Sequence, residues 1–132
     1  MGGQTSTLHT DGNAVPPLDD DLDGALYDTA CVHPGIDLIR DGFRLLATDR
    51  LTADETQTIL ATLTGYAGAD IVTALALTVQ RLTNPDSNPA LRGMPADRQQ
   101  QTRELGEQYA HLSTEFTPRP YAAEACGLID GI

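Results

Sequence analysis

The sequence predicts an all-α protein, a small bundle of four to five helices with a disordered N-terminal arm and an irregular C-terminal tail. Three observations lead to this prediction. Apolar residues recur at helical spacing in several segments, a Thr-x-x-Glu capping box marks one helix start, and proline or glycine interrupts the chain between segments. We therefore divide the chain into a flexible acidic arm (residues 1–19), a helical domain (residues 20–116) and a proline-containing tail (residues 117–132).

The first third of the chain is expected to hold a short helix and a longer one. Residues 1–17 are rich in Gly, Thr, Asn and Pro without periodicity, which is typical of a mobile arm. A short helical turn follows from about Asp20 to Cys31, and Pro34 suits the first position of the next helix, which ends near Thr48. The apolar face of that amphipathic helix is predicted to contain Ile36, Ile39, Phe43 and Leu46.

A capping box predicts the start of a third helix. The Thr52 hydroxyl can accept a hydrogen bond from the amide of residue 55, while the Glu55 side chain reaches back to the amide of residue 52. Gly65 is free to adopt a left-handed conformation, so we expect the helix to end there. Its buried face is predicted to contain Ile59, Leu60 and Leu63.

The segment 69–83 has two interpretations. We favour a helix that ends at Asn84-Pro85, because proline disfavours helical geometry in the residue before it. The run Ile71–Val79 also fits a buried strand, since periodicity alone cannot type a short apolar run. In the helical interpretation one face gathers Ile71, Leu75, Val79 and Leu82.

A long polar helix is predicted near the end of the chain. Residues 84–95 contain three prolines and form an irregular loop, after which the helix runs from about Ala96 to Glu115. Pro118 and Pro120 are expected to end it. Its large apolar residues lie at offsets of four, three and four, and this narrow stripe is predicted to pack across another helix: Leu105, Tyr109, Leu112 and Phe116.

The charge of the chain is strongly negative and unevenly distributed. There is no lysine, and eight arginines face nineteen acidic residues, for a net charge of -11. Residues 1–39 hold seven of the acids and no arginine. Such a field repels nucleic acid and anionic lipid and attracts basic protein surfaces. We therefore expect a basic protein partner, no direct nucleic-acid binding and no membrane, with the partner-binding residues Asp19, Asp20, Asp21, Asp23 and Asp28.

Cysteine usage and hydropathy favour a cytoplasmic protein. Residues 1–15 contain no apolar segment typical of a signal peptide, and the longest apolar run, Ile71–Val79, is far short of the ~20 residues that cross a bilayer. Two free thiols are the simplest expectation for Cys31 and Cys126 in a reducing compartment. A disulfide between them is the alternative.

One acidic run resembles the opening of a calcium loop. Asp19, Asp21 and Asp23 occupy the first, third and fifth positions, and Gly24 takes the sixth. The twelfth position needs a bidentate carboxylate, but Ala30 stands there. Calcium is therefore a minor alternative to a solvated acidic cluster, and no other cofactor is expected.

Two further groupings supply alternatives with a different chemistry. Cys31, His33, His111 and Cys126 offer zinc-ligand types, but their spacing matches no compact finger or knuckle. A small enzyme or ligand-binding helical domain is the other alternative. Its pocket would lie near Tyr66, Tyr109 and His111.

One stretch resembles the helix-turn-helix of LuxR-type regulators. The resemblance covers about thirty residues and rests on Leu51, Thr52, Glu55, Leu63, Gly65, Ile71, Leu75, Leu77 and Thr78. It implies DNA binding, but the recognition helix expected after Thr78 meets Pro85 almost at once and offers only Arg81 to phosphates. A degenerate helix-turn-helix regulator is therefore a further alternative, and a helical hairpin used for packing is the better interpretation.

The function that the sequence favours is a non-enzymatic interaction protein: an adaptor, assembly subunit or inhibitor that docks on a basic protein surface. The concentrated negative charge, the small size and the lack of a coherent catalytic set favour it. Its sharpest version is a DNA mimic whose carboxylates imitate a phosphate track. Homodimerisation through an exposed apolar stripe is compatible with this function and with the ligand-binding alternative.

Overall fold

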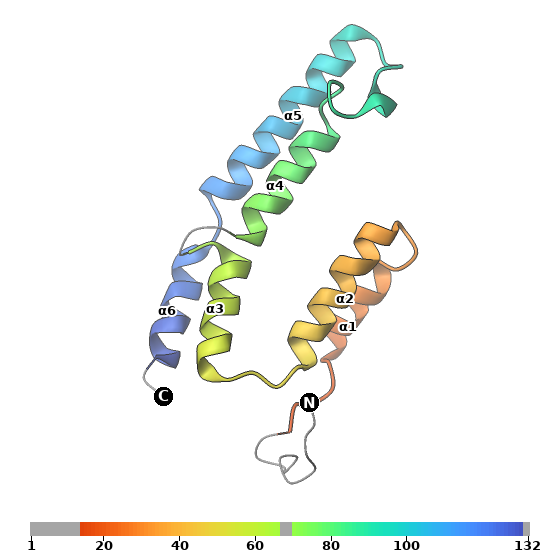
Figure 1. The fold of residues 1–132 in the computed structure, drawn as a ribbon. Coiled ribbons are helices and arrows are strands. Elements are labelled where there is room, and N and C mark those ends of the chain that lie inside the picture. Colours follow the sequence, from red (N-terminus) through yellow and green to blue (C-terminus); the bar gives the residue numbers. More distant parts are fainter. Residues whose placement is uncertain (1–13, 67–69, 131–132) are drawn as a thin grey trace. The chain divides into compact units, whose positions relative to one another are not determined.

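The protein is all-α, as predicted. The structure is a computed structural model that describes residues 14–66 and 70–130, and no strand occurs among them. Five helices fall within the predicted helical domain, and a sixth follows it (Figure 1). Most of the predicted arm, residues 1–13, lies outside the described residues. The elements in chain order are α1 (Asp20–Asp28), α2 (Pro34–Thr48), α3 (Ala53–Thr64), α4 (Ile71–Leu82), the 3-10 turn η2 (Pro89–Leu91), α5 (Ala96–Glu115) and α6 (Arg119–Ile129).

The chain divides into two compact units, Met1–Leu51 and Thr52–Ile132. The first unit holds α1 and α2, which an ion pair joins at 3.1 Å between Arg44 Nη1 and Asp23 Oδ1. Leu26 of α1 is buried. The turn at residues 29–33 and this ion pair connect the two helices.

The turn between α1 and α2 is shaped by local hydrogen bonds. His33 caps α2, because its Nδ1 accepts from the amide of Gly35 at 2.9 Å, and Pro34 takes the first helical position as predicted. Cys31 adopts a left-handed conformation with φ 64°, which is uncommon outside glycine. Its amide donates to Asp37 Oδ1 at 3.3 Å, and this bond helps to hold the turn.

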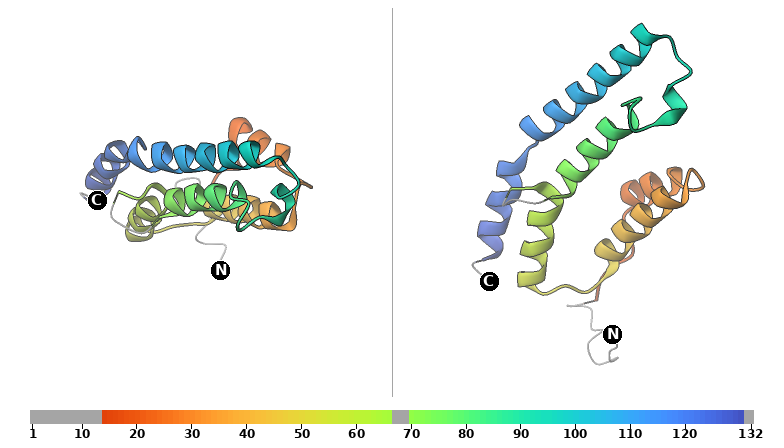
Figure 2. Two further views of the ribbon diagram at one scale, coloured as in Figure 1. Left: turned by 90° about the horizontal axis from the view of Figure 1, so that it is seen from above. Right: turned by 45° about the horizontal axis from the view of Figure 1, so that its top comes forward.

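In the second unit, α4 and α5 form an antiparallel hairpin, and α3 packs against α6 and α4 (Figures 1 and 2). Small residues line the α4–α5 contact: Ala76, Gly106 and Ala110 are all buried. Gly106 lies directly against Thr83, with no room for a β-carbon. Small side chains therefore let the two helix backbones approach closely. The run Ile71–Val79 lies in α4, so the predicted helix is confirmed and the alternative of a buried strand is not.

The two ends of α3 follow the prediction. The Thr52 hydroxyl accepts from the Glu55 amide and the Glu55 carboxylate accepts from the Thr52 amide, both at 3.0 Å. Gly65 ends the helix in the left-handed region, with φ 76°. The neighbouring α6 is tied to α3 by Gln57, whose Nε2 donates to the Cys126 carbonyl at 3.0 Å.

The α4–α5 connection is ordered by side chains. Pro85 is fully buried, and the Arg92 guanidinium donates to its carbonyl oxygen at 2.9 Å and to the Asp86 carbonyl oxygen at 3.1 Å. Gln99 at the start of α5 donates to the Met94 carbonyl oxygen at 2.8 Å. The loop is irregular, as predicted, but it is anchored at both ends.

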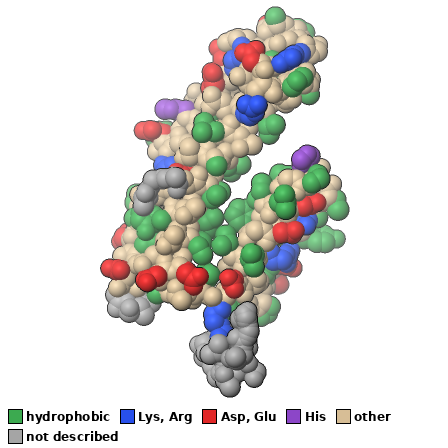
Figure 3. Space-filling model, viewed as in Figure 1, with side chains coloured by type: hydrophobic (Ala, Val, Ile, Leu, Met, Phe, Trp, Pro, Cys, Tyr) green, Lys and Arg blue, Asp and Glu red, His purple; other side chains and the backbone are tan. Residues whose placement is uncertain are grey.

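Two predictions are corrected by the second unit. The tail is not irregular over Arg119–Ile129, because α6 forms there and Pro120 lies in its first turn, where proline is tolerated. The apolar stripe of α5 does not pack across another helix, since Leu105 is 70% exposed and Phe116 is 73% exposed. Apolar side chains are open to solvent on both units in Figure 3. None of the described helices has the length and apolarity needed to cross a bilayer.

Candidate functional site

The five predicted partner-binding aspartates belong to one short helix: four lie in α1 and Asp19 caps it. Three of the five project from the same solvent-exposed side of the helix. Asp20, Asp21 and Asp28 are exposed and are separated by one, seven and eight positions, which places them on the same side of α1. The buried Leu26 lies on the other side. We call these three residues the acidic face.

The other two predicted aspartates have structural roles. Asp19 is the N-cap of α1, and its Oδ2 accepts from the Leu22 amide at 3.1 Å. Asp23 is paired with Arg44 of α2. Acids in the first turn also stabilise the helix dipole, so part of this cluster serves the fold of α1. The structure therefore gives Asp19 and Asp23 specific partners within the fold and leaves the three residues of the acidic face without such a role in a cap or an ion pair.

Two neighbours of the acidic face are not among the predicted partner-binding residues. Gly24 lies in the middle of α1, and a β-carbon placed there would meet nothing within 4 Å. Tyr27 projects strongly into solvent. An aromatic ring beside carboxylates can contact a guanidinium group through its face, and the only sequence signal for this was the position of Tyr27 next to Asp28.

The metal-ligand groupings of the sequence are not gathered by the described part of the chain. Asp21 and Asp23 lie inside α1 and Asp19 caps it, so these residues form a helical turn rather than a loop. No three His, Cys, Asp or Glu side chains among residues 14–66 and 70–130 are grouped to hold a metal ion. Cys31 and Cys126 are free thiols, the first exposed and the second buried.

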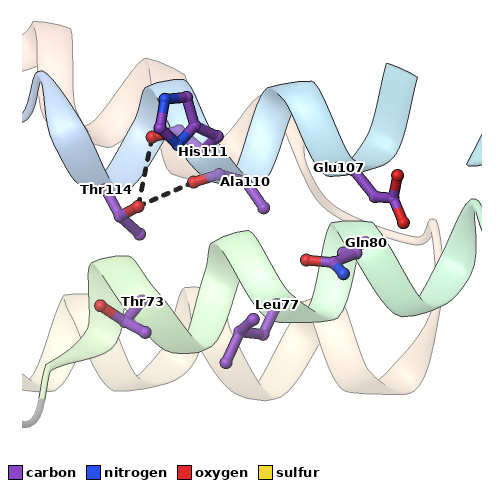
Figure 4. A pocket seen from close by; sticks show the side chains of 7 residues that line it. All are labelled: Thr73, Leu77, Gln80, Glu107, Ala110, His111 and Thr114. Carbon is purple, nitrogen blue, oxygen red and sulfur yellow. Dashed lines mark hydrogen bonds between the residues drawn. The ribbon is translucent and has the colours of Figure 1, made fainter. Parts of the chain in front are cut away.

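An open groove of about 470 Å³ runs between α4 and α5 (Figure 4). The Thr114 hydroxyl is already engaged, since it donates to the Ala110 carbonyl oxygen at 2.9 Å and to that of His111 at 3.2 Å. In the sequence, the pair Glu107 and His111 could have indicated this groove, because residues four apart lie on the same side of a helix. The lining residues are Thr73, Leu77, Gln80, Glu107, Ala110, His111 and Thr114.

The groove gathers only one of the three residues predicted to form a pocket. His111 lines it, whereas Tyr109 and Tyr66 do not. Tyr66 instead lies beside Cys126 of α6. The pKa of the Tyr66 phenol is raised above its ordinary value of 10.0, first by hydrogen bonding of the phenol to the Cys126 sulfur, then by burial and by the negative charge of that sulfur. Tyr66 follows the end of α3, so this pair lies beside the α3–α6 contact.

The segment of the helix-turn-helix resemblance folds as the two helices α3 and α4, and no further helix begins between Thr78 and Pro85. α3 and α4 are in contact, and α3 carries the predicted cap and glycine end. α4 ends at Leu82, with Arg81 as the basic residue of its last turn. Comparisons of the chain with protein-family models, with curated proteins and with solved structures found no match.

Proposed function

We propose that this chain is a non-enzymatic interaction protein, an adaptor, assembly subunit or inhibitor, that docks on a basic protein surface through the acidic face of α1. The observation that carries the proposal is the outward grouping of Asp20, Asp21 and Asp28 in the part of the chain that contains no arginine before Arg40. A charge of -11 attracts a basic partner over a distance and speeds its association. The same field disfavours nucleic acid as the ligand.

The geometry supports close contact as well as long-range attraction. Gly24 leaves space between the carboxylates, and Tyr27 offers an aromatic surface beside them. An arginine side chain of a partner can pair with a carboxylate in a bidentate fashion and stack on the ring. In the DNA-mimic version the partner is a nucleic-acid-binding protein whose phosphate-contacting residues meet these aspartates.

Ligand binding is a second candidate function, and the groove between α4 and α5 favours it. Glu107, Gln80 and His111 place a carboxylate, an amide and an imidazole along one opening. Tyr66 and Tyr109 do not line the groove, so of the three side chains predicted to form a pocket only the His111 imidazole is present. Docking through the acidic face is therefore the function that we put forward.

The test is capture of partners by the full chain from its native cell at two salt concentrations. The variant Asp20→Asn, Asp21→Asn, Asp28→Asn removes three charges from the acidic face. Its matched control, Asp97→Asn, Glu104→Gln, Glu124→Gln, removes three exposed charges from α5 and α6. We expect the wild type and the control to retain a basic protein in 0.1 M salt, and the acidic-face variant to lose it.

Raising the salt to 1 M shortens the screening length from about 10 Å to about 3 Å, so the captured protein should be released. Equal capture by the acidic-face variant and the control would show that α1 is not the docking site. Capture that is unaffected by salt would contradict the electrostatic basis of the proposal.

A further inference from the structure

The α4–α5 hairpin has an apolar face that no described residue of the second unit covers. We give the name apolar face to seven residues whose exposed fractions run from 43% to 73%. They are large, they project from both helices, and they are separate from the small residues that join the helices. The seven are Ile71, Leu75, Leu82, Leu105, Tyr109, Leu112 and Phe116.

The two halves of the apolar face are matched along the hairpin. Thr83 meets Gly106, and α5 runs antiparallel to α4. Leu82 therefore lies near the level of Leu105, and Ile71 lies near the level of Phe116. The apolar stretches of the two helices begin and end together, so the hairpin presents a face of uniform length.

Over the length of this face, from the level of Leu82 to that of Ile71, the charged side chains of the hairpin lie away from it. Arg98 lies on the same side of α5 as Leu105, seven positions earlier and beyond the end of the face. Glu107 and His111 line the groove (Figure 4), and a turn of 100° per residue places the groove and the apolar face on opposite sides of the hairpin. The same spacing directs Arg81 and Glu115 to the outer edges. Two copies of a highly acidic chain can therefore approach here with less repulsion than at other surfaces.

We propose that the apolar face binds the apolar face of a second copy, so that two hairpins form an antiparallel four-helix bundle. If each large side chain of the face is given the roughly 150–250 Å² that an aromatic residue buries, these exposed fractions amount to on the order of 700 Å². This area is somewhat below the ~800 Å² that one partner contributes to an interface of standard size, and it lies within the range of stable interfaces, about 600–1,000 Å² from each partner. Offsets of four, three and four on α5 also match the seam of a helical bundle. In a two-fold symmetric dimer the same contact buries the apolar face of both copies.

Self-association and docking on a basic partner respond to salt in opposite directions. Each copy carries a charge of -11, so low salt opposes the dimer through repulsion and added salt relieves it. Sulfate and other excluded salts also strengthen apolar burial. The proposal does not depend on the acidic face, so either proposal can fail alone.

The experiment is light scattering of the full chain over a range of concentrations and salt. We expect twice the chain mass of 14.1 kDa at high concentration, with a dissociation constant that falls as salt rises. The variant Leu75→Gln, Leu105→Gln should weaken the dimer at least tenfold. The matched control Leu38→Gln, Leu128→Gln changes two exposed leucines outside the apolar face and should leave the dissociation constant unchanged.

Circular dichroism of each variant checks that the helices persist. If the double variant loses helicity, the single variant Phe116→Gln at the end of the face replaces it. A wild type that keeps the mass of one chain under all conditions overturns the proposal. So does a mass that exceeds two chains, or a dimer that tolerates the changes in the apolar face but not the control changes.

Discussion

At the scale of single residues, Gly106 controls how closely α4 and α5 approach. A β-carbon at this position would lie 2.7 Å from the Thr83 Cβ, and closer still to the Thr83 hydroxyl oxygen. The hydroxyl is held by the Val79 carbonyl oxygen at 2.9 Å, so it cannot move aside freely. Gly106 is therefore a packing residue in a helix that would otherwise favour alanine.

We predict that Gly106→Ala destabilises the second unit. Alanine gains about 1 kcal/mol in helix propensity, whereas overpacking a tight contact costs about 1–3 kcal/mol, so the net free energy of unfolding should fall. Urea unfolding followed by circular dichroism measures it. Gly127→Ala is the control, because a β-carbon at Gly127 meets nothing within 4 Å, and it should stabilise the chain by about 0.5–1 kcal/mol. Equal effects of the two substitutions would contradict the tight contact.

Tyr66 should make stability depend on pH in the alkaline range. Its phenol has a pKa above the ordinary 10.0, mainly because of the hydrogen bond with the Cys126 thiol. Below that ordinary pKa both the folded and the unfolded chain keep the proton. As the pH rises past it, the unfolded chain releases its proton first, so the free energy of unfolding falls.

The measurement is an alkaline titration of the full chain by ultraviolet absorbance. We predict that Tyr66→Phe removes the phenolate absorbance that develops above the ordinary tyrosine range. Cys126→Ala should move this part of the titration back toward lower pH, because the hydrogen-bond partner is lost. A titration that neither substitution alters would rule out the pairing of these two residues.

At the scale of elements, the capping box makes the start of α3 independent of tertiary contacts. Both of its hydrogen bonds join residues three positions apart, so the sequence alone determines them. We predict that Thr52→Ala lowers the free energy of unfolding by about 0.5–2 kcal/mol. Thermal unfolding followed by circular dichroism checks this value. Thr58→Ala, at an exposed position in the same helix, should be neutral or slightly stabilising; a comparable loss there would show that the box has no special role.

Local signals also explain which elements could be predicted and which could not. The starts of α2 and α3 and the end of α3 were predicted because Pro34, Thr52 and Gly65 act through neighbouring backbone atoms. α6 is not predicted because Pro118 and Pro120 indicate the end of a helix in the sequence. Pro120 lies in the first turn of α6, where its missing amide hydrogen would have had no partner.

At the scale of the whole molecule, the packing surfaces could not be predicted from helical periodicity. The spacing of Leu105, Tyr109, Leu112 and Phe116 indicated a stripe correctly, but α4 contacts α5 through Gly106 and Ala110 instead. Both sets recur at helical spacing. The choice between them depends on how closely two backbones approach, and one sequence does not reveal this distance.

The candidate site was predicted in composition but not in detail. The acidic segment was evident from the sequence, yet the separation of Asp19 and Asp23 from the outward residues depends on a cap and on an ion pair with Arg44. The groove was not predicted, because residues of α4 and α5 meet there only after the hairpin forms. The position of a charged segment can be read from the sequence before the fold is known. Predicting a site that two helices share also requires the register in which these helices pack.

The two thiols differ in a way that chemistry can use. Cys31 is exposed in the turn after α1, and Cys126 is enclosed against α3. A maleimide dye or a nitroxide label therefore has one accessible attachment point on the native chain, three positions beyond Asp28. A label attached to Cys31 would therefore report on binding near the acidic face without any substitution. Alkylation of Cys126, in contrast, would show that α6 has separated from α3.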